Sequence, residues 1–200
     1  MPKTNAEKQE NIIKAAGIVF SQKGFHQARM DEIAEAAGVA KGTLYYNYSS
    51  KSKLFAATVT CGLNRIMAAI EAELASDLPF LDHLRAIVAT IIRLYISNKE
   101  VTRIYANEMS SGIEDEVRSE IKAVREQFTA FVEAQLQTGQ EKGYLAPLPS
   151  HLSAVAVIGI IDALCSHHLE HPDLHSPDEL TDTVFTILSS GLARNRQAGE

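Results

Sequence analysis

The sequence predicts an all-α protein of about nine helices. Apolar residues recur at intervals of three and four along most of the 200-residue chain, which is the period of a helix with one buried face. Glycine and proline interrupt this pattern at Gly38, Pro79 and Gly143, where helices are expected to end or begin. The periodicity supports no strand. A small N-terminal module of three helices and a larger C-terminal helical domain are therefore expected.

Residues 30–47 predict two short helices joined by a tight turn. The first helix, 30–37, has Asp31 and Glu32 in its first turn, where acidic side chains favour the positive end of the helix dipole. Gly38 provides the left-handed residue that ends this helix, and a second helix follows over roughly 40–47. A turn this tight is typical of a helix-turn-helix, which places its second helix in the major groove of DNA.

The second helix carries hydrogen-bonding groups where a packing helix would carry aliphatic ones. Leu44 is its single strong apolar anchor, and Gly42 costs about 0.5–1 kcal/mol of helix stability relative to alanine. The next helix opens with serines and lysines, a favourable site for an anion. An ordinary helical hairpin with a basic end is the alternative. The residues expected to contact DNA are Arg29, Lys41, Gly42, Thr43, Tyr45, Tyr46, Asn47 and Lys51.

The distribution of charge favours the same interpretation. The chain has a net charge of −6, but residues 1–54 hold eight Lys/Arg and five Asp/Glu, a net charge of +3. The remaining residues have a net charge of −9. Positive charge is therefore concentrated in the segment that contains the helix-turn-helix, as expected for a protein that presents one face to a nucleic acid.

Residues 12–55 resemble the DNA-binding domain of the TetR (tetracycline-repressor-like) family of bacterial transcription regulators. The motifs that carry this resemblance are Ile13, Ala16, Val19, Phe20, Gly24 and Phe25, then Asp31, Ile33, Ala34, Ala37, Gly38 and Val39, and finally Gly42, Thr43, Leu44, Tyr45, Tyr48 and Lys51. The chain departs from the family pattern at the two helix starts, where Ala28–Arg29 and Ala40 replace the usual capping hydroxyl residues. Arg29 is expected to contact a phosphate through its charge instead.

The resemblance implies two domains, a helix-turn-helix DNA-binding domain over residues 1–54 and an effector-binding and dimerisation domain over residues 55–200. In the second domain the apolar pattern predicts helices over about 52–75, 79–97, 100–110, 113–141, 150–169 and 176–194. The 52–75 helix begins in the DNA-binding domain and ends in the other, so it is expected to link them mechanically.

The last two predicted helices are expected to form a homodimer interface. The 150–169 helix is apolar nearly all round, so more than one of its faces must be covered. A dimer doubles the DNA site that one short helix can read, and an intramolecular core alone is the alternative. The residues expected at this interface are Val157, Ile161, Leu164, Val184 and Leu188.

The resemblance also implies a small-molecule site in the C-terminal domain. Its expected walls are Ile66, Ile70, Ile87, Ile91, Tyr105, Glu108, Met109, Phe128 and Phe131. These residues favour an apolar or amphipathic effector, whose identity the sequence leaves open. The function expected from the resemblance is that of a repressor released from double-stranded DNA, at an inverted-repeat operator, by its effector. A constitutive DNA-binding protein without an effector is the main alternative.

Other sequence features limit the remaining classes of function. The polar N-terminus and the absence of an uninterrupted apolar run predict neither a secretory signal nor a membrane span, and two cysteines without metal spacing are typical of reduced thiols in the cytoplasm. His167, His168, His171 and His175 form a cluster with metal-like spacing; the negative end of a helix dipole also favours them. We expect no cofactor, and no nucleophile with a neighbouring base supports an enzyme.

Overall fold

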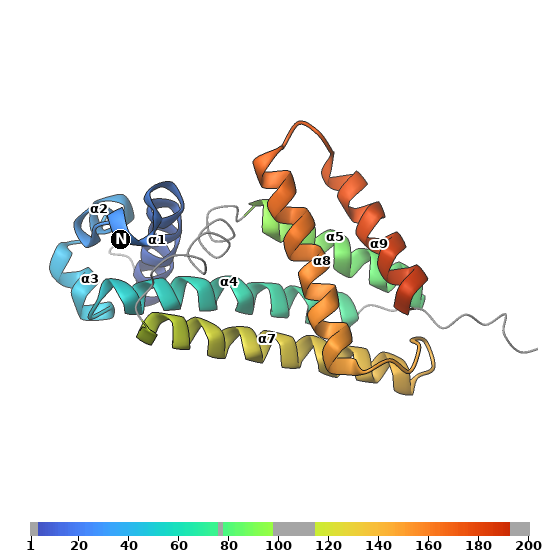
Figure 1. Cartoon of the computed structure of the whole chain (residues 1–200). Coiled ribbons are helices and arrows are strands. Elements are labelled where there is room, and N and C mark those ends of the chain that lie inside the picture. The colour runs from blue at the N-terminus through green and yellow to red at the C-terminus, as the bar shows by residue number, and fades with distance from the viewer. Residues whose placement is uncertain (1–3, 76–77, 98–114, 193–200) are drawn as a thin grey trace, which may run out of the picture. The chain divides into compact units, whose positions relative to one another are not determined.

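The computed structural model describes residues 4–75, 78–97 and 115–192, which form eight α-helices and no strand (Figure 1). The predicted all-α class is confirmed, whereas the helix predicted over 100–110 lies outside the described residues. The described residues group into two compact units, one made of 4–64 with 115–124 and the other of 65–75, 78–97 and 125–192. Helices α4 (Lys51–Leu74) and α7 (Asp115–Glu141) each contribute residues to both units.

The first unit begins with α1 (Asn5–Gln27), α2 (Met30–Ala37) and α3 (Lys41–Asn47). Thr4 caps α1, because its hydroxyl accepts from the Glu7 N–H at 3.2 Å while the Glu7 carboxylate accepts from the Thr4 N–H at 2.7 Å. Near its end α1 is interrupted at Gly24, whose φ of 72° lies in the region that favours glycine. The interruption precedes the buried Phe25.

Three phenylalanines form the centre of the first unit's core. The ring of Phe55, from α4, lies 5.1 Å from the rings of both Phe20 and Phe25 in edge-on arrangements, which the quadrupoles of aromatic rings favour. Further side chains from α1, α2, α3, α4 and α7 complete this core, namely Ile12, Ile33, Leu44, Leu54, Val59 and Ile121. Ile121 belongs to α7, so residues far apart in the sequence share one core.

The second unit contains α5 (Phe80–Ser97), α8 (Ser150–Glu170) and α9 (Pro177–Leu192), together with the remaining parts of α4 and α7. Helices α8 and α9 form an antiparallel pair, and α5 packs against both of them (Figure 1). Ser176 caps α9 as Thr4 caps α1, with the Glu179 carboxylate accepting from the Ser176 N–H at 2.7 Å. The buried side chains that form this unit's core include Val88, Ile92, Ala154, Val184 and Leu188.

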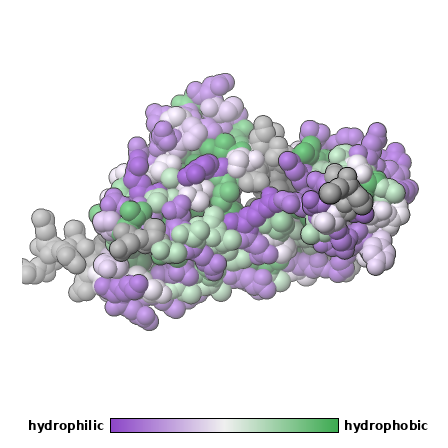
Figure 2. Space-filling view, turned by 180° about the vertical axis from the view of Figure 1, so that it is seen from behind, coloured by the Kyte–Doolittle hydropathy of each residue, from purple (hydrophilic) through white to green (hydrophobic). Residues whose placement is uncertain are grey.

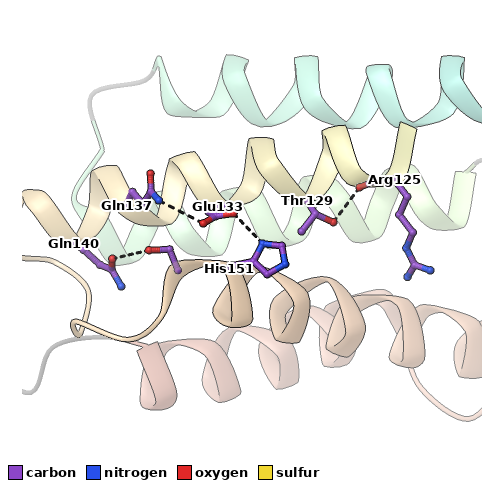
Figure 3. Close-up of polar contacts among 7 residues, drawn as sticks. Arg125, Thr129, Glu133, Gln137, Gln140 and His151 are labelled. Carbon is purple, nitrogen blue, oxygen red and sulfur yellow. Dashed lines mark hydrogen bonds and ion pairs between the residues drawn. The ribbon is translucent and has the colours of Figure 1, made fainter. Parts of the chain in front are cut away.

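A set of polar contacts fixes the start of α8 against α7 (Figure 3). The Gln140 amide donates to the carbonyl oxygens of Ala146 and Leu148 at 3.0 and 2.7 Å, and its own oxygen accepts from the Ser150 hydroxyl at 3.2 Å. One residue later along α8, His151 Nδ1 lies 3.0 Å from the Glu133 carboxylate. These contacts hold the loop after α7 in one conformation, so α8 begins at a defined place in the unit.

Apolar side chains remain exposed on parts of the second unit. The face drawn in Figure 2 mixes hydrophilic (purple) and hydrophobic (green) residues. By length and composition alone, α4 and α8 are apolar enough to cross a membrane, although a third of each apolar stretch is buried inside the chain. Both helices supply core residues, such as Phe55 and Ile158, so part of this apolarity serves packing within the chain.

Candidate functional site

The turn between α2 and α3 has the geometry that the sequence predicts. Gly38 adopts φ 65° and ψ 39°, its N–H donates to the Glu35 carbonyl at 3.0 Å, and the Val39 N–H donates to the Ala34 carbonyl at 3.0 Å. These bonds satisfy the last carbonyl groups of α2. Leu44 is fully buried in the core, so one side of α3 is anchored in the unit and the opposite side faces solvent.

The outward side of α3 presents four of the residues expected to contact DNA. Lys41, Gly42, Tyr45 and Tyr46 are exposed, and Tyr46 retains 87% of its accessible surface. The Lys41 ammonium forms an exposed ion pair with Asp31 at 2.8 Å, which raises the pKa of Lys41 through the hydrogen bond from its side chain. Such an exposed pair contributes little to stability, so Lys41 can exchange its partner for a phosphate or a base.

Gly42 is not required by packing within the chain. A Cβ atom at this position would meet no neighbouring side chain or other element within 4 Å, and the residue lies in the first turn of a short helix. Glycine there costs helix stability without relieving any steric conflict inside the protein. An approach of another molecule to the α3 backbone would account for this residue.

Two other residues expected to contact DNA have partners inside the unit. The Lys51 ammonium donates to the carbonyl oxygens of His26 and Ala28 at 3.0 and 3.1 Å and lies 4.6 Å above the ring of Phe25. The Asn47 amide donates to the Thr43 carbonyl at 2.8 Å and accepts from Gln9 at 3.2 Å. Arg29 is exposed at the start of α2 and Thr43 is half-buried. No local pattern in the sequence indicates the long-range partners of Lys51.

The second unit contains a cavity of about 390 Å³, within the range of small-molecule sites. Five of the residues expected to line a ligand site do so here, namely Ile70, Ile87, Ile91, Phe128 and Phe131. Ile66 is half-buried and is not among the lining residues, while Tyr105, Glu108 and Met109 lie outside the described residues. The further apolar walls, which the sequence analysis missed, include Leu74, Phe80, Leu84, Val132, Leu136, Tyr144, Leu145 and Ile158.

Asp162, from α8, is the acidic residue among the described cavity walls. The Tyr95 hydroxyl donates to one of its oxygens, and the Arg125 guanidinium lies 3.4 Å from the other. Burial raises the pKa of Asp162 to about 6 and that of the neighbouring Cys165 thiol to about 12, because a charged group loses its hydration there. Both cysteines are free thiols.

The residues expected at a dimer interface divide into two groups. Ile161, Val184 and Leu188 are buried in the unit's own core, while Val157 and Leu164 are half-buried; Val157 and Ile161 also line the cavity. The three buried side chains are thus already covered by the protomer. A different side of α8 is exposed, with Leu152 retaining 66% and Val155 51% of their accessible surface, and Ala156 and Gly159 beside them.

Two histidines of the cluster lie together, and a third is separate from them. The rings of His167 and His171 lie 4.9 Å apart, whereas His168 is buried on the other side of the helix. Among the residues that the structure describes, no group of three or more His, Cys, Asp or Glu side chains is placed to hold a metal ion.

The fold and the exposed recognition helix define a helix-turn-helix DNA-binding protein with a second, helical unit that contains a cavity. Comparison with models of known protein families agrees with this class of protein. Residues 12–58 match the model of the bacterial regulatory proteins of the tetR family, and residues 77–192 match that of a tetracyclin repressor-like C-terminal domain. The chain belongs to the tetR family of bacterial transcriptional regulators.

Relatives and solved structures support this assignment. The chain is 30% identical to the HTH-type transcriptional regulator RutR of Escherichia coli (strain K12) over 149 residues, which cover 72% of this chain and 68% of RutR. It is 22% identical to the uncharacterized HTH-type transcriptional regulator YhgD of Bacillus subtilis (strain 168), covering 94% and 98% of the two chains. These relatives are transcriptional regulators and not enzymes.

The fold is shared with two solved structures of regulators named FadR. The fatty acid degradation regulator FadR from Bacillus halodurans superposes with a TM-score of 0.82 at 23% identity, covering 91% of this chain and 98% of that one. The transcriptional regulator FadR from Bacillus subtilis, solved in complex with stearoyl-CoA, has a TM-score of 0.79 at 21% identity and the same coverage.

Proposed function

We propose that this regulator is a repressor that a small apolar or amphipathic effector releases from its operator. The observation that carries the proposal is the presence, in one chain, of an exposed polar recognition helix and of an apolar cavity of about 390 Å³. An effector releases DNA only if it binds the DNA-incompetent arrangement more tightly than the competent one. Helices α4 and α7 supply residues to both units, so they are the proposed connection between effector and DNA.

The chemistry of the cavity supports an effector with a substantial apolar part. Aliphatic and aromatic side chains from α4, α5, α7 and α8 form most of its lining. FadR from Bacillus subtilis, which shares the fold, was solved with stearoyl-CoA, a molecule with a long apolar chain. We place the effector of the present protein in the same broad chemical class of molecules with an extended apolar part.

The proposed regulator acts as a homodimer in the bacterial cytoplasm. The exposed apolar side of α8, with Leu152, Val155 and Gly159, and the exposed Ile187 of α9 form the proposed dimer face. Two recognition helices related by two-fold symmetry would read an inverted-repeat operator whose half-sites lie about 34–36 Å apart, or a multiple of that distance.

The test begins with selection of DNA sequences from a random pool by the purified full-length chain. We expect the selected sequences to share an inverted repeat and the affinity to fall by about 10³ or more between 50 and 200 mM salt, because Lys and Arg side chains release counterions from the phosphates. No enrichment, or an affinity that is insensitive to salt, would contradict DNA binding by α3. An effector screen on the selected operator then separates a repressor that responds to a ligand from a constitutive DNA-binding protein.

A further inference from the structure

We propose that the effector carries a protonated amine, which binds the Asp162 carboxylate, on an apolar chain that fills the rest of the cavity. This inference rests on the proposed function of the cavity as an effector site and specifies the charge of the effector's polar group. It follows from three features of the second unit: the position of Asp162, the weakness of its internal ion pair, and the distance to other cations.

Asp162 is a carboxylate placed among apolar walls. It lies on α8 one residue after Ile161, which is buried and lines the same cavity, and Ile91 of α5 and Phe128 of α7 complete the apolar surroundings. Removing a carboxylate from water is costly unless its charge is compensated. A ligand cation with an N–H group would supply both an opposite charge and a hydrogen bond at this place.

The partners of Asp162 within the chain compensate its charge only in part. Tyr95 donates a hydrogen bond from its hydroxyl but is neutral. The Arg125 guanidinium approaches only to 3.4 Å, and its side chain retains 43% of its accessible surface. A contact of this length is at the weak limit of hydrogen bonding, and an exposed cation is screened by water. Asp162 would therefore repel a carboxylate or phosphate at this end of the cavity.

The basic residues that line the cavity, His83 and Lys142, lie towards the end opposite Asp162. Lys142 follows the end of α7, and at about 1.5 Å of rise per residue it is roughly 25 Å along that helix from Arg125. His83 lies roughly 18 Å along α5 from Tyr95 by the same measure. The Phe80 and Tyr144 rings are stacked at 5.0 Å on this far side. The cavity thus has an acidic end and a basic end, with apolar walls between them.

The experiment compares three probes with the same chain length. Decylamine, decanol and decanoate are titrated calorimetrically, without DNA, into the full chain near neutral pH. We expect decylamine to bind about tenfold or more tightly than decanol, because only the amine is complementary to the partly buried Asp162 carboxylate. We expect the same margin over decanoate, because Lys142 at the basic end is exposed and its charge is screened by water. Asp162→Asn removes the charge and keeps an oxygen that can accept from Tyr95, so it should abolish the preference for decylamine.

Two further variants make the result specific. Asp182→Asn is the matched control, because Asp182 is an exposed carboxylate of the same unit that pairs with Arg85 outside the cavity lining; it should keep the preference. Arg125→Gln removes the competing cation and should strengthen the preference. Arg125→Gln therefore tests the inference even if Asp162→Asn does not fold.

Two outcomes would overturn the inference. One is that decanoate or decanol binds the unaltered chain as tightly as decylamine. The other is that Asp162→Asn, folded as judged by its thermal transition, still prefers the amine. Because these titrations contain no DNA, their failure is distinct from failure of the proposed repressor function, which would appear as missing operator selection.

Discussion

Gly42 shows at the scale of one residue how DNA binding and stability can oppose each other. Since a Cβ there would meet no neighbouring side chain or other element within 4 Å, Gly42→Ala should raise the free energy of unfolding by about 0.5–1 kcal/mol. We expect the same substitution to weaken operator binding, because the added methyl group lies where DNA approaches the α3 backbone. Urea unfolding and fluorescence anisotropy with labelled operator measure the two effects. Unchanged operator affinity would show that DNA does not approach Gly42.

Substitution of Lys51 is expected to change stability in the opposite direction to substitution of Gly42. Its ammonium binds two carbonyl oxygens after Gly24 and lies over the Phe25 ring. Lys51→Ala should therefore lower the free energy of unfolding by about 1–2 kcal/mol, since charge-assisted hydrogen bonds and a cation–π contact are lost together. Thermal and urea unfolding measure this loss. Tyr46→Ala is the control for an exposed residue and should leave stability within about 0.5 kcal/mol. A Lys51→Ala variant of normal stability that binds all DNA weakly would support a phosphate contact instead.

Asp162 should make the stability of the protein depend on pH. Its folded-state pKa of about 6 lies above the ordinary aspartate pKa of 3.8, so ionisation disfavours the folded state, and stability decreases as the pH rises from about 4 through 6. The charged or titratable groups beside it are Tyr95, Arg125 and Cys165. Asp162→Asn should therefore be as stable as the unaltered chain at about pH 3 and more stable near pH 7.5, by an amount on the order of 2–3 kcal/mol at most. A difference that does not change with pH would contradict the raised pKa.

At the scale of helices, the two sides of α8 and α9 predict different responses to charge. Val155→Glu, on the proposed dimer face, should separate the dimer while each protomer stays folded, because the new charge is exposed once the dimer has dissociated. Ile161→Glu should unfold the protomer, because it places an unpaired charge among buried apolar groups. Sedimentation and circular dichroism distinguish the two results.

Leu81→Glu is the matched control for this comparison. Leu81 retains 48% of its accessible surface on α5 and is not part of the proposed dimer face, so the same charge there should change neither assembly nor folding. A stable dimer of Val155→Glu would place the interface elsewhere.

The contrast between α2 and α8 explains which elements could be predicted from the sequence. Helix α2 is bounded by local signals, acidic residues at its start and Gly38 at its end, and its predicted bounds of 30 and 37 match the structure. Helix α8 is apolar nearly all round, so its composition predicts a covered helix but not which side its own chain covers. Ile161 and Val155 are similar residues in the sequence and differ only in their neighbours in space.

The candidate sites show the same limit. The exposed side of α3 follows from one buried anchor, Leu44, and the period of a helix. The partners of Lys51 lie 23 and 25 residues away, and those of Asp162 lie 37 and 67 residues away. Contacts at such separations depend on tertiary packing, for which this single sequence offered no pattern.

For the whole molecule, the proposed response to an effector requires a cavity that can be filled. Ile87→Trp adds a large side chain to the cavity wall, at a cost of about 1–3 kcal/mol if the surroundings must shift. We expect this variant to bind the operator and to lose release by effector, as measured by anisotropy with increasing ligand. Leu81→Trp, on the same helix but outside the lining, should respond normally. Normal release from Ile87→Trp would place the effector elsewhere.

The contribution of α7 to the first unit's core has a consequence for exchanging parts between regulators. Ile121 retains only 2% of its accessible surface among residues of α1 to α4, and Lys53 pairs with Glu120. A fragment that ends after the helix-turn-helix, or shortly after it, would leave the apolar site of Ile121 open to water. A chimera that transfers the DNA specificity of this protein to another regulator must therefore carry the first turns of α7, or a recipient helix with an apolar residue in that register. The unit that can be exchanged is therefore defined by its packed core and not by one continuous stretch of chain.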